Sequence, residues 1–141
     1  MKTYIFSSIL FTLTLLSTTH LKAQQMPDSA KHNYVVLTKK VAQLQPIILT
    51  AEALKAEDGD AFADFEIIIC GKDIGDITDT EKIEGFIEKA EKAGVHIVAC
   101  GFSLNKFNVD KAKVPKEIKI VENGILYNFQ LQKKGYKSIS L

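Results

Sequence analysis

The sequence contains no arginine, so all 18 of its basic residues are lysines. Arginine is the side chain best suited to bidentate recognition of phosphate and carboxylate groups. Nucleic-acid-binding domains also usually carry a concentrated basic patch. Here 17 acidic residues balance the lysines, and the formal net charge is only +1. We therefore expect no nucleic-acid partner.

The sequence also lacks the common motifs of cofactor and nucleophile sites. It has no GxGxxG fingerprint, no Walker phosphate loop and no GxSxG elbow. The acidic residues Asp58, Asp60 and Asp64 depart from the EF-hand pattern because Phe62 occupies a ligand position, so we interpret them as a solvated loop. Two cysteines and three histidines match no metal-ligand spacing. We expect neither a metal nor a cofactor.

The first 23 residues have the composition of a secretory signal peptide. Lys2 supplies a charged start, Ile5–Leu16 is apolar and uncharged, and Ala23 is a small residue at the expected cleavage point. A membrane anchor is the less favoured alternative, because a spanning helix needs roughly 20 apolar residues. Removal of 23 of the 141 residues leaves 118, and loss of Lys2 and Lys22 leaves 16 lysines against 17 acidic residues, a net charge of −1. We expect a secreted or periplasmic protein that is not membrane-bound after cleavage.

Residues 24–33 show no periodicity, and we expect them to form a flexible leader. Beyond them, short β-branched runs alternate with helical patterns. Strands are predicted at Tyr34–Thr38, Phe65–Ile69, Val95–Ala99, Ile118–Val121 and Tyr136–Ser140. This alternation predicts one α/β domain over residues 34–141, with a five-stranded, mostly parallel sheet.

Local signals place the first two helices. Pro46 prevents an undisturbed helix over Lys39–Ala56, so the helix either kinks at Pro46 or begins there with Pro46 in its first turn. Thr78 and Glu81 have the spacing of a capping box, and Gly94 is a typical helix stop.

The last helix is predicted to begin at Asn123-Gly124 and to end near Lys134. The apolar residues Ile125, Leu126 and Phe129 are expected to face inward.

Both cysteines end an apolar strand and are followed by glycine. FEIIICGK places Cys70 before Gly71, and VHIVACGFSL places Cys100 before Gly101. In parallel sheets, ligands and reactive groups collect outside the carboxyl ends of the strands. The cysteines are therefore candidates for chemistry, although a small buried thiol without a chemical role is the alternative for each.

Neighbouring groups favour Cys100 as the reactive thiol. The turn after it carries Ser103 and free backbone N–H groups, which lower a thiol's pKa and favour the thiolate. Lys72 stands near Cys70 and can stabilise a thiolate there, or it is simply solvated. His96 lies at the opposite end of its strand from Cys100, so we interpret it as a structural or edge histidine rather than a base.

Whether the cysteines meet depends on the strand order. Adjacent strands run about 4.8 Å apart, which falls within the roughly 4.4–6.8 Å Cα separation of a disulfide. If another strand lies between them, Cys70 and Cys100 cannot bond.

Three segments give the chain a family resemblance. AGVHIVACGFSL (Ala93–Leu104), VENG (Val121–Gly124) and LQKKGYKSI (Leu131–Ile139) resemble the DsrE/DsrF-like family. FEIIICGK also looks like that family's second strand, including the glycine after it. The resemblance extends over about Tyr34–Leu141, most of the predicted mature chain.

The resemblance implies a DsrEFH-like three-layer α/β/α fold with the second and third strands side by side, which favours a Cys70–Cys100 disulfide. It also implies a homo-oligomer, a trimer or hexamer. In the sulfur-relay branch of the family, a cysteine at the position matched by Cys100 carries persulfide sulfur. It implies no role for Cys70.

Two functional hypotheses follow. In the first, the protein is an exported carrier of sulfane sulfur, a sulfurtransferase-like activity in which Cys100 accepts the sulfur and Cys70 is a resolving or disulfide partner. Its partner is a sulfur donor or acceptor protein or a small sulfur compound, bound near Gly71, Lys72, Gly101 and Ser103. In the second, the protein is a non-catalytic oligomeric module that binds a small ligand.

Overall fold

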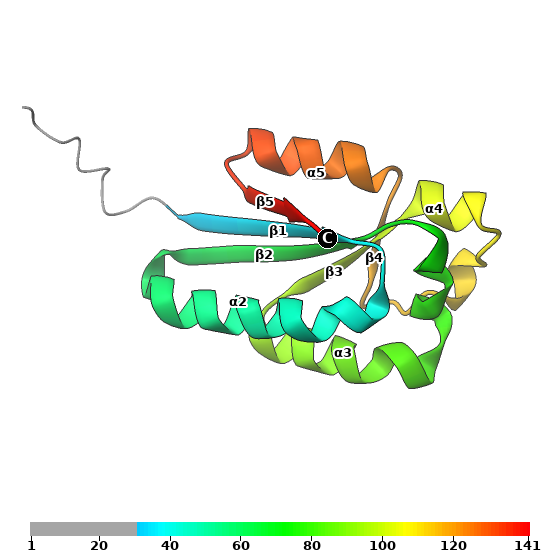
Figure 1. The fold of residues 1–141 in the computed structure, drawn as a ribbon, viewed down its shortest axis with the longest axis horizontal. Helices are drawn as coiled ribbons and strands as arrows, with labels where there is room; N and C mark the ends of the chain where they lie inside the picture. Colours follow the sequence, from blue (N-terminus) through cyan, green and yellow to red (C-terminus); the bar gives the residue numbers. More distant parts are fainter. Residues whose placement is uncertain (1–30) are drawn as a thin grey trace, which may run out of the picture.

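The computed structural model describes residues 31–141, so the predicted signal peptide and most of the predicted leader lie outside the described residues. Five strands form one sheet in the order β4-β3-β2-β1-β5 (Figure 1). All four strand pairings are parallel, which confirms the predicted α/β class. The strands are β1 (His32–Thr38), β2 (Phe62–Ile69), β3 (His96–Cys100), β4 (Lys119–Val121) and β5 (Lys137–Ser140).

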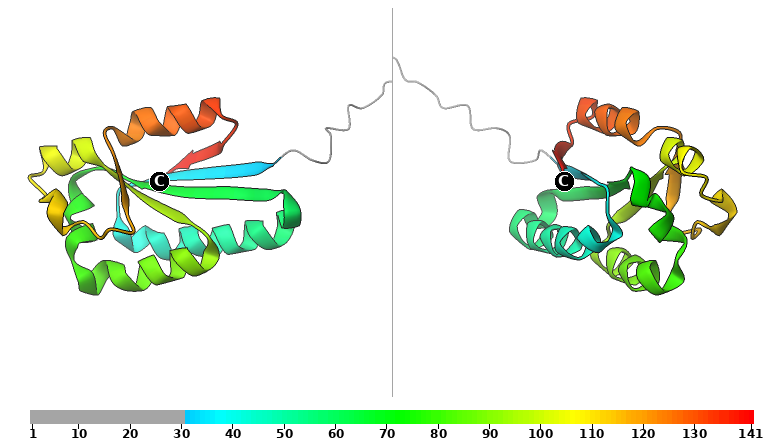
Figure 2. Two further views of the ribbon diagram at one scale, coloured as in Figure 1. Left: turned by 180° about the vertical axis from the view of Figure 1, so that it is seen from behind. Right: turned by 45° about the vertical axis from the view of Figure 1, so that its right-hand side comes forward.

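Helices cover both faces of the sheet. Helices α2 (Leu44–Asp58) and α3 (Thr80–Ala93) lie on one face, and α5 (Gly124–Lys133) lies on the other (Figures 1 and 2). The steps from β1 to β2 and from β2 to β3 run in the same direction, so right-handed crossovers place α2 and α3 together. Strand β5 returns to the far side of β1, and α5 therefore crosses the opposite face. The result is a three-layer α/β/α fold.

Shorter segments connect these elements. Helix α4 (Gly101–Lys106) follows β3 at the carboxyl end of the strands (Figure 1). The 3₁₀ segments are η1 (Val41–Gln43), η2 (Gly59–Ala61), η3 (Lys72–Thr78) and η4 (Lys111–Lys113).

The observed ends of α2 and α3 test the local signals predicted for these helices. Helix α2 begins at Leu44, so Pro46 lies in its first turn, where a missing N–H costs little. The predicted capping box of α3 is wrong, because Asp79 is the N-cap residue and makes no side-chain capping bond. Thr78 instead donates its hydroxyl to the carbonyl of Gly75 at 2.8 Å. The predicted stop at Gly94 is confirmed by its left-handed conformation, with φ of 73°.

Helix α5 begins as predicted but faces the other way. Oδ1 of Asn123 accepts hydrogen bonds from the amides of Ile125 and Leu126 at 3.0 and 3.1 Å. The prediction that Ile125, Leu126 and Phe129 face inward is wrong, since they are 58%, 55% and 59% exposed. The helix instead turns Gly124, Tyr127, Asn128 and Leu131 toward the sheet.

The reason lies in the strand beneath α5. Glu66 is only 7% exposed on β2, and its Oε1 accepts a hydrogen bond from the hydroxyl of Tyr127 at 2.9 Å. A buried carboxylate requires a polar partner. Tyr127 therefore meets the sheet together with buried Leu131, whereas Ile125, Leu126 and Phe129 face away from it.

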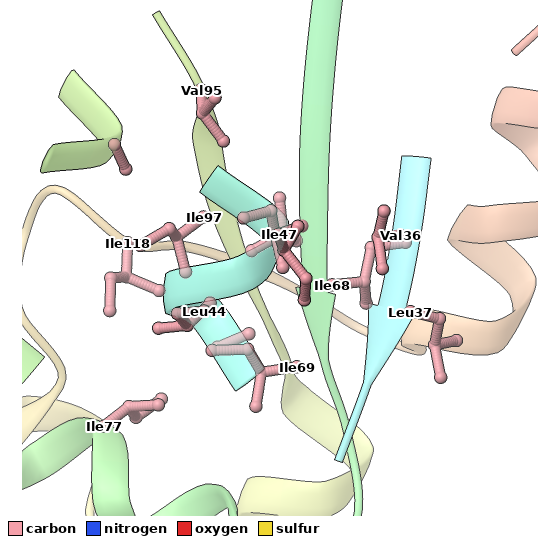
Figure 3. Close-up of a cluster of buried hydrophobic side chains, with 14 of the residues drawn as sticks. Val36, Leu37, Leu44, Ile47, Ile68, Ile69, Ile77, Val95, Ile97 and Ile118 are labelled. Atoms are coloured by element: carbon pink, nitrogen blue, oxygen red, sulfur yellow. The ribbon is translucent and has the colours of Figure 1, made fainter. Parts of the chain in front are cut away.

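The main core lies between the sheet and the α2–α3 layer. Ile67 and Ile69 of β2 are fully buried there, and Figure 3 shows Leu44 and Ile47 of α2 beside the strands. Truncating a buried leucine such as Leu44 to alanine typically costs about 2–5 kcal/mol. This continuous core fixes the strands whose ends form the site.

The acidic residues have structural partners. The hydroxyl of Tyr34 donates to Asp58 at 2.6 Å, and that of Tyr136 donates to Asp64 at 2.5 Å. The predicted solvated loop is therefore wrong for Asp58, which ends α2, and for Asp64, which belongs to β2. Among residues 31–141, no helix has the length and apolar character that crossing a membrane requires.

Candidate functional site

The two cysteines lie side by side at the carboxyl ends of neighbouring strands. Strands β2 and β3 pair with Ile69 opposite Ala99, so Cys70 and Cys100 follow at the same level. The alternative in which another strand separates them is therefore excluded. Both thiols are buried and free, with no disulfide between them.

Gly124, the first residue of α5, closes over both sulfurs. Its amide donates a hydrogen bond to Sγ of Cys100 at 3.2 Å. A Cβ atom at this position would lie 2.5 Å from Sγ of Cys70 and 3.1 Å from Cβ of Cys100. Only glycine permits the start of α5 to approach the cysteine pair this closely.

Ser103 of α4 connects the two strand ends. It is buried, and its Oγ accepts a hydrogen bond from the amide of Gly71 at 3.0 Å. Hydrogen bonding by the Ser103 side chain also acts to lower the pKa of Cys100. Ser103 therefore ties the end of β2 to the helix that follows Cys100.

Two of the predicted binding residues are glycines with backbone roles. Gly71 has a backbone φ of 93°, a conformation that residues other than glycine rarely adopt. At Gly101, a Cβ atom would lie 2.8 Å from the carbonyl oxygen of Val121. Glycine therefore permits the left-handed backbone after Cys70 at Gly71 and the close approach of β4 at Gly101.

The thiols have opposite pKa shifts. Burial acts to raise the pKa of Cys100, but hydrogen bonds from the Ser103 hydroxyl, from the amides of Gly124 and Ser103, and from the Cys70 thiol lower it below the ordinary value. Burial, together with the charge and hydrogen bond of Cys100, raises the pKa of Cys70 to about 12. Cys100 is therefore the more acidic thiol of the pair, and Cys70 the less acidic one.

An open hollow of about 310 Å³ gives access to the pair. Its walls are largely apolar, and its only charged side chains are two lysines. The lining residues are Leu37, Lys39, Cys70, Gly71, Cys100, Phe102, Ser103, Lys106, Phe107, Asn123 and Ile125.

Two other sequence candidates lie outside this hollow. Lys72 is exposed at the start of η3 and does not line it. His96 is exposed at the opposite end of β3, where its Nε2 lies 3.7 Å from Asp64. The edge interpretation of His96 is confirmed.

Several site residues were not predicted from the sequence. They are Gly124, Lys39, Lys106 and the two aromatic residues that line the hollow, Phe102 and Phe107. Lys39 and Gly124 had a usable signal, because they closely follow β1 and β4, and the carboxyl ends of parallel strands meet at one edge. Lys106 and Phe107 had none, since their placement depends on the direction of α4. In the part of the chain that the structure describes, no three His, Cys, Asp or Glu side chains are arranged to hold a metal ion.

Comparisons with known proteins support the fold alone. No protein-family model matches the sequence, and a search of curated proteins found no significant match. The structure is similar to MTH1491, a protein of unknown function from Methanobacterium thermoautotrophicum, with a TM-score of 0.63 and 16% identity over 77% of this chain and 100% of that one. It is also similar to BT1422, a conserved protein of unknown function from Bacteroides thetaiotaomicron, with a TM-score of 0.57 and 18% identity over 77% of this chain and 95% of that one.

Proposed function

We propose that the protein is a DsrE/DsrF-like carrier of sulfane sulfur, with Cys100 as the sulfur acceptor. The observation that supports this most directly is the set of donors around Cys100. The amide of Gly124 donates to its sulfur, and hydrogen bonding by Ser103 further lowers its pKa, which favours a thiolate beside an open hollow. A thiolate is the form of cysteine that attacks sulfur.

The proposed cycle begins when the Cys100 thiolate attacks a sulfane sulfur atom. A persulfide forms on Cys100, and the donor leaves with the electron pair of the broken bond. An acceptor thiolate then attacks the outer sulfur and releases the Cys100 thiolate. No metal or cofactor takes part.

Cys70 is the resolving partner in this proposal. When no acceptor arrives, the Cys70 sulfur attacks Sγ of the Cys100 persulfide and hydrosulfide leaves, carrying the proton of Cys70. The product is a Cys70–Cys100 disulfide, which two thiol equivalents reduce. Because the pKa of Cys70 is raised to about 12, this step is slower than transfer to an ionised acceptor thiol.

We also propose that the protein is exported and forms a homo-oligomer. The signal-like residues 1–23 support export, and intact-mass analysis of the protein recovered outside the cytoplasm would show a chain that begins at residue 24. The exposed side chains of Ile125, Leu126 and Phe129 on α5 support contact with a second copy. Phe129→Glu is expected to lower the molar mass measured by light scattering to that of a monomer, whereas Glu88→Gln on α3 leaves it unchanged.

The central test compares Cys100→Ser with Cys70→Ser. After a brief exposure to a sulfane-sulfur donor and immediate alkylation without reduction, which trap the persulfide before Cys70 resolves it, wild-type protein gains the mass of one sulfur, mapped to Cys100. Cys70→Ser still gains it, and Cys100→Ser does not. Full sulfur transfer by folded Cys100→Ser would falsify the proposal.

A small-ligand-binding module without catalysis is the second candidate. The apolar walls formed by Phe102, Phe107 and Ile125 favour it, since ligand pockets are mostly apolar. This alternative predicts two free thiols that never accept sulfur, and ligand binding that Cys100→Ser leaves unchanged.

A further inference from the structure

The hollow beside Cys100 is lined by two positively charged side chains and by no carboxylate. Lys39 and Lys106 line it, and no aspartate or glutamate does. Within residues 31–141, the ion pairs involve His32, Lys82 and His96, so neither lining lysine is neutralised by a carboxylate. An anion entering the hollow therefore meets two ammonium groups and no carboxylate, and the Cys100 thiolate is the only anionic side chain in the lining.

Each lysine is held by its surroundings. Lys39 follows β1, and its Cβ and Cγ lie 3.6 and 3.5 Å from the position that a Cβ atom on Gly71 would occupy. The stem of Lys39 therefore packs against the turn after Cys70. Lys106 ends α4, and its ammonium lies 6.0 Å from the centre of the Phe107 ring. The two lysines thus approach the cysteine pair from different elements.

The apolar part of the hollow increases the effect of these charges. Leu37, Phe102, Phe107 and Ile125 form most of the remaining wall. Charge–charge attraction is stronger beside apolar surface than in open water. At about 310 Å³, the space is at the lower end of ligand-pocket volumes, roughly 300–1,000 Å³. Because Cys100 is only 3% exposed, a reagent must be small to reach its sulfur.

We propose that this hollow selects a small anionic sulfane-sulfur donor of the thiosulfate and thiosulfonate class. Lys39 and Lys106 hold the oxidised, anionic end, and the outer sulfur of the donor faces Cys100. This inference rests on the proposed function and names the substrate class of the same site.

The reaction balances without an added oxidant. The Cys100 thiolate attacks the outer sulfur of thiosulfate, and a new sulfur–sulfur bond forms. The sulfur–sulfur bond of thiosulfate breaks, and sulfite leaves with its electron pair. With a thiosulfonate, a sulfinate leaves in the same way. The total negative charge is the same before and after transfer, and the lysines stabilise the departing anion.

The first experiment measures charge selection without sulfur chemistry. Cys100 of the full chain is alkylated with iodoacetate, which is anionic, and with iodoacetamide, which is neutral. In Lys39→Gln/Lys106→Gln, the ratio of the iodoacetate rate to the iodoacetamide rate is expected to fall about tenfold. Lys92→Gln is the matched control, because Lys92 is exposed in the last turn of α3 and lies outside the hollow, and it leaves the ratio unchanged. Added salt lowers the ratio in wild-type protein more than in the double variant.

The second experiment measures sulfite released in a single turnover with thiosulfate. The double variant is expected to release sulfite about tenfold more slowly than wild type, while its persulfide formation with a neutral organic polysulfide is unchanged. If the anionic end is the recognised feature, the rate of sulfur transfer from a thiosulfonate should fall in the double variant as it does with thiosulfate.

The outcomes separate this inference from the function on which it rests. If wild-type protein accepts sulfur but the lysine variants change neither the alkylation ratio nor the thiosulfate rate, the donor class is wrong and the carrier function stands. If wild-type Cys100 accepts sulfur from no donor, the carrier function and the donor assignment both fail.

Discussion

Cys70 and Cys100 end adjacent strands at the same level of the sheet, yet their pKa values shift in opposite directions. Both are buried, and burial alone acts to raise the pKa of each thiol. The difference arises from hydrogen bonding, because bonds from Ser103 and Gly124 lower the pKa of Cys100. The two thiols are therefore not equivalent: Cys100 is suited to act as the nucleophile, and Cys70 is the proton-bearing partner.

The rate at which iodoacetamide alkylates Cys100 should rise with pH to a plateau. The midpoint of this profile should lie at a pH below the pKa of an ordinary thiol. Only the thiolate reacts, and its hydrogen bonds lower the pKa of Cys100. Ser103→Ala removes one donor, so the midpoint of the profile moves to higher pH. Ser138→Ala, on the exposed strand β5, is the control and keeps the wild-type midpoint. An unchanged midpoint in Ser103→Ala would show that this hydroxyl does not tune the thiol.

Oxidation with diamide should join Cys70 and Cys100 without unfolding the protein. The neighbouring strands bring the two positions within the separation that a disulfide requires. The bond is expected to block sulfur uptake and to raise the free energy of unfolding by about 3 kcal/mol. Alkylation followed by intact-mass measurement detects the bond, and denaturant titration measures the stability.

Cys70→Ala is the control for this oxidation, because it leaves no partner for Cys100. Monomers that remain fully alkylated on both thiols after diamide treatment would contradict the predicted bond.

The sequence predicted the sheet because its strands are short, β-branched and regularly spaced. Val95–Ala99 was predicted as a strand, and the structure has His96–Cys100. The sequence also placed each cysteine at a strand end. It could not show from the residues alone whether the strands are neighbours, because strand order depends on packing across the whole sheet.

The wrong prediction of the buried face of α5 has a physical cause that is not visible in the local sequence. Ile125, Leu126 and Phe129 form an apolar group, but α5 packs on β2, where the carboxyl group of buried Glu66 is bonded to Tyr127. The face of α5 was therefore selected by a polar partner that lies far away in the sequence. The position of Gly124 after β4 was a usable signal, but its close contact with the cysteines of two other strands emerges only from the packed sheet.

Tyr127→Phe should destabilise the fold by about 1–3 kcal/mol. The hydroxyl of Tyr127 donates to Oε1 of buried Glu66, whose Oε2 has no hydrogen-bond partner. Removing the hydroxyl leaves the buried carboxylate without this donor. Denaturant titration measures the loss of stability. Glu66→Met removes the need for a partner, so Tyr127→Phe should cost less in that background, and an equal cost in both backgrounds would argue against the pairing.

Gly124→Ala should disrupt the cysteine site as well as the fold. The added methyl would lie 2.5 Å from Sγ of Cys70 and 2.9 Å from Cγ2 of Ile68. Relieving this overlap requires α5 to move away from Cys100, which lengthens the hydrogen bond from residue 124 to its sulfur. We expect a loss of about 1–3 kcal/mol in stability and a shift of the Cys100 alkylation profile to higher pH.

Gly85→Ala gives the matched control for this substitution. Gly85 lies inside α3, and a Cβ atom there meets nothing within 4 Å. The same change should therefore stabilise the protein by about 1 kcal/mol and leave the alkylation profile unchanged. Cys70→Ala removes the sulfur nearest the new methyl, so it should recover part of the stability lost in Gly124→Ala. If the two substitutions are instead additive, the overlap with Cys70 is not what makes glycine necessary at residue 124.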